Sequence, residues 1–215
     1  VINPNRLDES TEYKYLAAVG VSFLFLVALA NKLREKGFFT VIQEPNLIDY
    51  LDLVALGTVC DVMPLIGLNR ALVKQGLKVM ASRKNIGLKV LSDIANISSV
   101  PECYHLGFLI GPRINAGGRV GESFLGSKLL SSKSEIEALE LAEKLEQFNR
   151  QRKIIEDSII EEAKNLATLQ SDKNLIMVSG EWHPGVIGIV AGKIKEIYNK
   201  PVAVVSIINN IAKAS

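Results

Sequence analysis

One periodic segment constrains the fold of this 215-residue chain more than any other feature. Ser134 and Glu137 form an S-x-x-E capping box, a typical helix start. An apolar stripe at helical spacing then continues to about residue 168. At 1.5 Å per residue, a helix over residues 135–168 would be about 50 Å long, more than the core of a small domain needs. The sequence therefore predicts a helix that connects two lobes.

The residues before the connecting helix carry helical patterns of their own. Helices are predicted over residues 13–36, over 47–59 after a cap at Asn46, over 69–82 and over 87–95. Asp49 and Asp52 are expected to turn outward from the second of these. The apolar run Leu16–Ala30 is shorter than the roughly 20 residues that span a bilayer, so we expect a buried core helix and no membrane contact.

The residues after the connecting helix change to a strand–helix–strand pattern. Strands are predicted over 175–180 and 201–208, with a helix over 183–198 between them. This order is typical of a right-handed parallel crossover unit. The fold class is therefore α/β, with a mostly helical first part. The predicted parts are 1–132, the connecting helix 133–168, and an α/β lobe 169–215. Because the chain starts with Val1 and stops at Ser215 soon after a strand, we expect both ends to be cut.

Composition indicates an ordinary soluble protein with local anion contacts at most. Hydrophobic residues make up 48% of the chain, and the net charge is +2 with a pI near 8.5. This mildly basic balance permits an anionic partner but falls short of a dedicated nucleic-acid-binding domain. Cys60 and Cys103 lie far apart among apolar neighbours, so we expect two reduced thiols in a cytosolic protein, without structural zinc or disulfides.

Asp61 is the leading candidate for a metal ligand. It closes the apolar run Leu53–Cys60 and is followed by Val62, Met63 and Pro64. A carboxylate at the end of a buried element needs a metal, a base or a hydrogen-bond donor as partner. A helix-end carboxylate neutralised by a lysine or arginine is the alternative. Magnesium or manganese needs several ligands, and no cluster of Asp, Glu and His marks a second centre.

The segment Gly111–Arg119, GPRINAGGR, is the best candidate for a phosphate contact. It is predicted to be a glycine-rich loop in which Gly117 and Gly118 let backbone amides approach a ligand. Arg113 and Arg119 offer planar guanidinium groups that match phosphate oxygens. The alternative is a structural turn with solvated arginines.

Two further segments carry candidate polar residues. His183 follows Trp182 and precedes a proline that suits a first helical turn, where exposed amides attract an anion; packing of the lobe is the alternative. His105, among apolar neighbours, is expected to be a satisfied core histidine. The basic band 149–153 is expected to be an exposed helix face, or to follow a nucleic-acid backbone if two lobes close around it.

Taken in order, these strings resemble the RecJ family of single-strand-specific DNA exonucleases in the DHH phosphoesterase superfamily, over nearly the whole chain. The strings are LDLVALGTVCDVMPL, GPRINAGGR, NRQRK and WHPGVIGIVAGKI with the strand PVAVVS. The resemblance implies the C-terminal part of a DHH domain, a linking helix and the start of a DHH-associated domain. It also implies two divalent ions, Mn²⁺ or Mg²⁺, and single-stranded DNA between the lobes.

The resemblance also implies roles for individual residues. Asp61 matches a metal-ligating aspartate, and His183 matches a catalytic histidine near the scissile or adjacent phosphate. The expected DNA contacts are Arg113, Asn115, Arg119, Arg150 and Ser215, the last at the opening of a motif that helps hold the DNA 5′ end.

The early D-x-D and Asp-His-His motifs of the family are not in this chain, and VINPNR resembles the family's residues just after the Asp-His-His motif. We therefore expect an internal piece that binds DNA weakly and cuts nothing. The parent is expected to be a cytoplasmic, monomeric 5′-to-3′ exonuclease of repair and recombination, with a single-strand-binding protein and a helicase as partners. The rivals are a DHH phosphodiesterase of short oligonucleotides or cyclic dinucleotides, and a degenerate non-catalytic scaffold.

Overall fold

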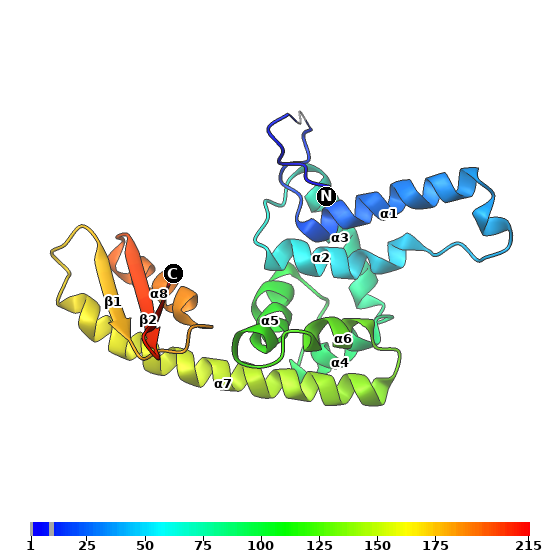
Figure 1. Cartoon of the computed structure of the whole chain (residues 1–215). Helices are drawn as coiled ribbons and strands as arrows, with labels where there is room; N and C mark the ends of the chain where they lie inside the picture. The colour runs from blue at the N-terminus through cyan, green and yellow to red at the C-terminus, as the bar shows by residue number, and fades with distance from the viewer. Residues whose placement is uncertain (1, 9–10) are drawn as a thin grey trace. The chain divides into compact units, whose positions relative to one another are not determined.

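A computed structural model describes residues 2–8 and 11–215 of the chain. The described chain is rich in helix and carries one small sheet, which agrees with the predicted α/β class (Figure 1). It divides into two compact units. Unit 1 comprises the residues up to Pro112 together with Leu129–Ala142, and unit 2 comprises Arg113–Lys128 and Glu143–Ser215. Val1, with which the VINPNR string begins, lies outside the described residues.

The predicted long helix is confirmed as α7, Glu135–Thr168, and both units contain part of it. The Ser134 hydroxyl accepts a hydrogen bond from the Glu137 amide at 3.4 Å, as a capping box requires. The Glu137 carboxylate accepts from the Ser132 hydroxyl at 3.0 Å. The start of α7 is therefore held by side chains that precede it in sequence.

Unit 1 contains helices before α7. They are α1 (Ala18–Glu35), the 3-10 turns η1 (Phe38–Thr40) and η2 (Leu47–Tyr50), α2 (Leu51–Cys60), α3 (Gly67–Ala81), α4 (Ile86–Ile94) and the π-helix η3 (His105–Ile110). Helix α3 packs closely on α2, because a Cβ added at Gly76 would lie under 3.0 Å from the Leu51 carbonyl oxygen. Leu51, Val54 and Leu72 form the core of this pair.

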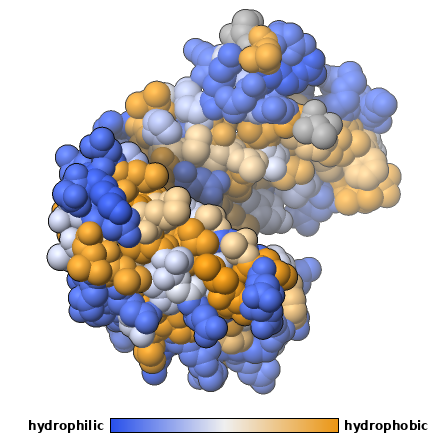
Figure 2. Space-filling view, turned by 60° about the vertical axis from the view of Figure 1, so that its left-hand side comes forward, coloured by the Kyte–Doolittle hydropathy of each residue, from blue (hydrophilic) through white to orange (hydrophobic). Residues whose placement is uncertain are grey.

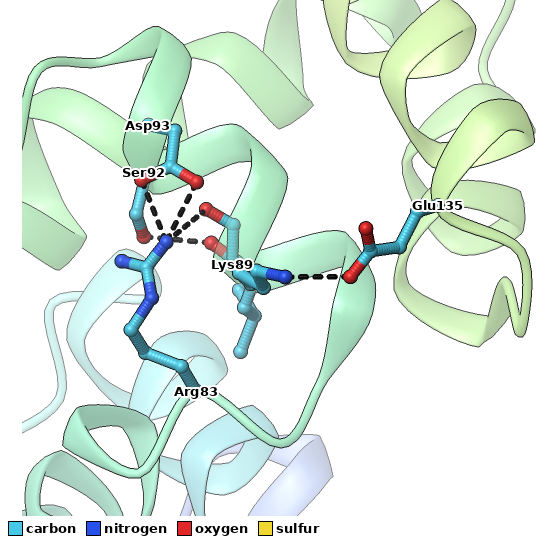
Figure 3. Close-up of polar contacts among 6 residues, drawn as sticks. Arg83, Lys89, Ser92, Asp93 and Glu135 are labelled. Atoms are coloured by element: carbon cyan, nitrogen blue, oxygen red, sulfur yellow. Dashed lines mark hydrogen bonds and ion pairs between the residues drawn. The ribbon is translucent and has the colours of Figure 1, made fainter.

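Helix α4 is tied to the first turn of α7 by charged side chains (Figure 3). Lys89 Nζ lies 2.5 Å from Glu135 Oε1, and Arg83 Nη2 lies 2.6 Å from each carboxylate oxygen of Asp93. Gly87 allows the backbones to approach, since a Cβ there would overlap the Leu129 carbonyl. Lys89 and Arg83 are thus each paired with a carboxylate.

The expectation of a buried helix at residues 13–36 is wrong in two respects. Helix α1 begins at Ala18, after turns, and its only buried residues are Gly20 and Ala30. Large apolar residues on it stay exposed: Phe25, Leu26, Val27 and Leu29. An apolar sequence predicts a helix with a surface that favours burial, but it does not show which residues bury that surface. The other described residues cover only part of the apolar surface of α1. No helix within residues 2–8 and 11–215 is long and apolar enough to cross a membrane.

The prediction that Asp52 faces outward is wrong. Its side chain is buried, and its Oδ1 accepts a 2.7 Å hydrogen bond from the Leu53 amide. Burial raises the pKa of this carboxyl. The reason is the 3-10 turn Leu47–Tyr50, which has three residues per revolution instead of 3.6 and so rotates the side chains of the next turn. Asp49, within the 3-10 turn, faces outward as expected and pairs with Lys84.

The predicted glycine-rich loop at Gly111–Arg119 is also wrong, because these residues form helix α5, Gly111–Val120. The π-helix η3 leads directly into it, and Pro112, which has no N–H to donate, follows this wider turn. A Cβ at Gly111 would lie 2.5 Å from Cys60 Sγ, and one at Gly117 would lie 3.1 Å from Leu145 Cδ2. These glycines allow close packing of the helix rather than access to a ligand.

Unit 2 contains α5 from Arg113 onward, α6 (Leu125–Ser131) up to Lys128, and α7 from Glu143 onward. It also contains β1 (Ile176–Gly180), α8 (Ile187–Tyr198), β2 (Val202–Ile208) and β3 (Ile211–Ala214). Strand β1 pairs in parallel with β2, with Ile176 opposite Val202, and β3 adds antiparallel to β2. The predicted parallel strand–helix–strand unit is confirmed. Asn209 and Asn210 both have positive φ, which suits the tight β2–β3 hairpin.

The core of unit 2 joins the sheet, α8 and the second part of α7. Its buried residues include Val178, Val204, Val190, Ile194 and Ala163. Helix α8 begins at Ile187, three residues later than the proline was expected to place it. In Figure 2, hydrophobic residues also reach the surface in patches on the face shown.

Candidate nucleic-acid interface

Asp61 lies at the C-terminal end of α2 and is exposed, so the expectation that it avoids solvent is wrong. The helix ends in a Schellman motif, in which the Met63 amide donates to the Thr58 carbonyl at 3.2 Å and the Val62 amide to Val59 at 3.0 Å. Val62 takes φ +54°, a left-handed conformation that is costly for a β-branched residue. Ending the helix in this way directs the Asp61 side chain out of the core.

Asp61 alone does not make a metal centre. Among residues 2–8 and 11–215, no group of three or more His, Cys, Asp and Glu side chains could hold an ion. One exposed carboxylate offers at most two oxygens, whereas Mg²⁺ and Mn²⁺ take about six ligands. The residues described here therefore do not by themselves fit the divalent ions that the sequence led us to expect.

The predicted DNA contacts Arg113 and Arg150 meet at one carboxylate. Arg113 Nε lies 2.7 Å from Glu146 Oε2, and Arg150 Nε lies 3.0 Å from Glu146 Oε1. The side chains of Arg113 and Glu146 are only 12% and 15% exposed, whereas that of Arg150 is 74% exposed. The net positive charge of this triad is therefore presented by Arg150, and Arg113 also anchors α5 to α7.

Arg119 and His183 lie beside one another in unit 2. Arg119 Nη1 donates to the Gly185 carbonyl at 3.0 Å, and the Gly185 amide donates to His183 Nδ1 at 3.1 Å. Because Nδ1 accepts a hydrogen bond here, a neutral His183 ring carries its proton on Nε2. Asn115 is exposed on α5, four residues before Arg119 and so on the same side of the helix.

Ser215 follows strand β3, and its side chain lies close to the first turn of α8. It bonds to Val204 through both backbone groups, and a Cβ added at Gly188 would lie 3.1 Å from Ser215 Oγ. The Ile189 and Val190 amides in the first turn of α8 bond to the Val186 carbonyl. Amides that a helix N-terminus leaves without a backbone partner attract anions. The structure thus gathers Arg119, His183 and Ser215 near this helix start, in an arrangement suited to a phosphate group.

The remaining candidates are mainly structural. Trp182 is buried, its Nε1 donates to Glu162 Oε2 at 2.5 Å, and its carbonyl accepts from Ser206 Oγ, so the packing alternative holds for it. The His105 ring has a hydrogen-bond partner, as expected, because its Nδ1 accepts from the Glu102 amide at 2.9 Å. The residue is only half-buried, however, and does not lie in the core.

The band 149–153 is not one exposed face, since Asn149 is buried and accepts from Arg152. Arg152 in turn pairs with Glu156, and both side chains are nearly nine-tenths buried. The residues that stay exposed in the band are Arg150, Gln151 and Lys153. The composition of the band suggested one exposed face, but five consecutive residues point to all sides of a helix, and two of them are buried.

Sequence reasoning overlooked Glu146, the carboxylate between two candidate arginines, and an exposed pair of aromatic rings at the start of η3. The i,i+4 spacing of Glu146 and Arg150 was a usable signal for the first. The same spacing of Tyr104 and Phe108 was a signal for the second.

Comparison with known proteins finds several relatives with the same description. The chain is 41% identical over 211 residues to the single-stranded-DNA-specific exonuclease RecJ of Haemophilus influenzae, and 42% identical over 212 residues to that of Escherichia coli. These matches cover 94% of this chain but only 36% and 37% of the relatives. The RecJ of Bacillus subtilis is 32% identical over 211 residues, which cover 96% of this chain and 25% of the relative. No protein-family model matches the chain.

Solved structures give the same result for the fold. A crystal structure of exonuclease RecJ bound to manganese matches with a TM-score of 0.78 at 34% identity, over 93% of this chain and 49% of that one. RecJ of Thermus thermophilus in complex with Mn²⁺ matches with a TM-score of 0.76 at 36% identity, over 87% of this chain and 27% of that one. In both sequence and fold, this chain corresponds over nearly its whole length to a segment of the RecJ single-stranded-DNA-specific exonucleases.

Proposed function

We propose that the polypeptide of which this chain is a segment is a divalent-metal-dependent exonuclease that degrades single-stranded DNA from the 5′ end. The observation that carries this proposal is the match of 94% of the chain to RecJ exonucleases. The grouping of Arg119, His183 and Ser215 near the start of α8 supports it, because such a group suits a phosphate of the DNA backbone.

Within this proposal, residues 1–132 belong to a DHH domain, 133–168 link it to a DHH-associated domain, and 169–215 begin the latter. Asp61 supplies one ligand to Mn²⁺ or Mg²⁺, and polypeptide outside this chain supplies the others. His183 acts at the scissile or adjacent phosphate, while Arg113, Asn115, Arg119, Arg150 and Ser215 contact the strand. The parent works as a cytoplasmic monomer in repair and recombination, with a single-strand-binding protein and a helicase.

The test is metal-dependent cleavage by the full-length protein. Asp61→Ala is expected to abolish release of nucleotides from 5′-labelled single-stranded DNA in manganese while leaving the circular dichroism spectrum unchanged. Asp172→Ala, which removes another exposed acid, serves as the matched control and should retain activity. Near-normal cleavage by Asp61→Ala would remove Asp61 from the site. Faster hydrolysis of a dinucleotide than of a long strand would favour a phosphodiesterase of short oligonucleotides.

A further inference from the structure

Two aromatic rings stack on each other at the surface, one from Phe108 in η3 and one from Tyr104 just before it. The ring centroids of Tyr104 and Phe108 are 5.2 Å apart, and the ring planes differ by 24°. Phe108 is 70% exposed and Tyr104 is 58% exposed. Each ring covers one face of the other, so much of the aromatic surface of the pair remains open to solvent. Exposed aromatic surface of this kind is typical of a binding site.

The Tyr104 ring of the pair is held in place by His105. The His105 ring is positioned by the Glu102 amide at Nδ1 and lies 3.4 Å from Ser99 Oγ at Nε2. The Tyr104 ring meets it edge to face, with centroids 6.0 Å apart and planes at 72°. The Tyr104 ring is therefore braced before any ligand arrives, which lowers the entropy cost of binding.

The element that carries the pair packs against the end of α2 where Asp61 follows. A Cβ added at Gly107 would lie 3.5 Å from Val59 Cγ1, and the Cys60 thiol lies 3.6 Å from the Leu106 carbonyl oxygen. These contacts join the middle of η3 to the last turn of α2. The aromatic pair and the proposed metal ligand thus belong to two neighbouring elements of the same unit.

We propose that Tyr104 and Phe108 form a stacking platform for the bases of single-stranded DNA on its way to the Asp61 site. This proposal rests on the proposed function. Every nucleobase has a flat apolar face, so stacking on an aromatic side chain tolerates any sequence and needs an unpaired strand. The platform would therefore hold the bases of the strand within unit 1.

The test measures binding of the full-length protein to oligothymidylate in EDTA, where metal-dependent cleavage does not interfere. An oligonucleotide of the same length with abasic sugars serves as the second probe, because it keeps the phosphates and lacks the bases. Phe108→Ala and Tyr104→Ala are expected to weaken binding to oligothymidylate by about 5-fold or more. Neither should change binding to the abasic strand, and Phe108→Trp should restore binding to oligothymidylate.

Tyr50→Ala is the matched control, because Tyr50 is 51% exposed and lies at the opposite end of α2. It should bind both probes as the wild type does. Equal affinity of the wild type for the two probes would overturn the proposal, as would an unchanged affinity of Phe108→Trp and Phe108→Ala for oligothymidylate. A large loss of thermal stability in Phe108→Ala without any base-dependent loss would show that other polypeptide covers the rings. Because cleavage plays no part in this measurement, its failure would leave the exonuclease proposal standing.

Discussion

Gly185→Ala and Gly192→Ala make the same chemical change in the same unit, and the structure predicts opposite effects on stability. A Cβ added at Gly185 would lie under 3.0 Å from the Arg119 carbonyl oxygen and 2.9 Å from its carbonyl carbon. It would also lie 3.1 Å from His183 Cε1. A Cβ added at Gly192, which is exposed on α8, would have nothing within 4 Å.

The magnitudes depend on these surroundings. The obstacles at Gly185 are mostly backbone, so relief requires the loop and α5 to separate, and overpacking of this kind costs about 1–3 kcal/mol. The 3.0 Å hydrogen bond from Arg119 to the Gly185 carbonyl would be strained or lost as well. Alanine at position 192 replaces a glycine inside a helix, which is favourable by about 0.8–1 kcal/mol.

The assay is urea unfolding of the 215-residue chain, followed by tryptophan fluorescence. Trp182 is the single tryptophan and is buried in unit 2, so the signal reports the unit that contains both substitutions. The midpoint should fall for Gly185→Ala and rise for Gly192→Ala, with unchanged slopes. A stability for Gly185→Ala equal to or above that of the wild type would refute the close approach of α5 to this loop.

Two further substitutions test the polar and strained positions of unit 1. Burial raises the pKa of Asp52 above its unfolded value, so the folded state holds its proton more tightly and stability falls as pH rises through the shifted pKa. Asp52→Asn keeps the side-chain oxygen that accepts from the Leu53 amide. It should therefore raise the melting temperature at pH 7 but change it little at about pH 4. Asp49→Asn, at an exposed carboxylate paired with Lys84, is the control and should not raise the melting temperature. Val62→Gly should stabilise the chain by about 1 kcal/mol, because φ is +54° and the side chain is 87% exposed, so little packing is lost. A lower melting temperature for this variant in circular dichroism would contradict the strained helix end.

Local patterns predicted the regular elements well where nearest neighbours decide them. The capping box and the apolar stripe predicted α7 with its observed bounds, since hydrogen bonds within a helix link residues four apart. The strand–helix–strand unit was also predictable from local pattern. Runs rich in β-branched residues predicted the two strands, and the amphipathic segment between them predicted the helix that connects parallel strands.

Local patterns failed where the phase of the backbone or a distant partner decided the outcome. Gly111–Arg119 has the composition of a loop, yet the segment is a helix. Gly111 and Gly117 face Cys60 and Leu145, which are far away in sequence, and only Gly118 is exposed among its three glycines. A single 3-10 turn was enough to reverse the predicted orientation of Asp52.

From the amino-acid order alone, most of the helices, strands β1 and β2, and the resemblance of this chain to one family were determined, because these depend on residues a few positions apart or on strings that stand in order. Tertiary structure alone decided that Arg113 on α5 reaches Glu146 on α7, and that Arg119 reaches the loop of His183. These are pairings between elements separated by tens of residues. Their free energy depends on which surfaces the folded chain brings within a few ångströms, a quantity that no periodicity contains.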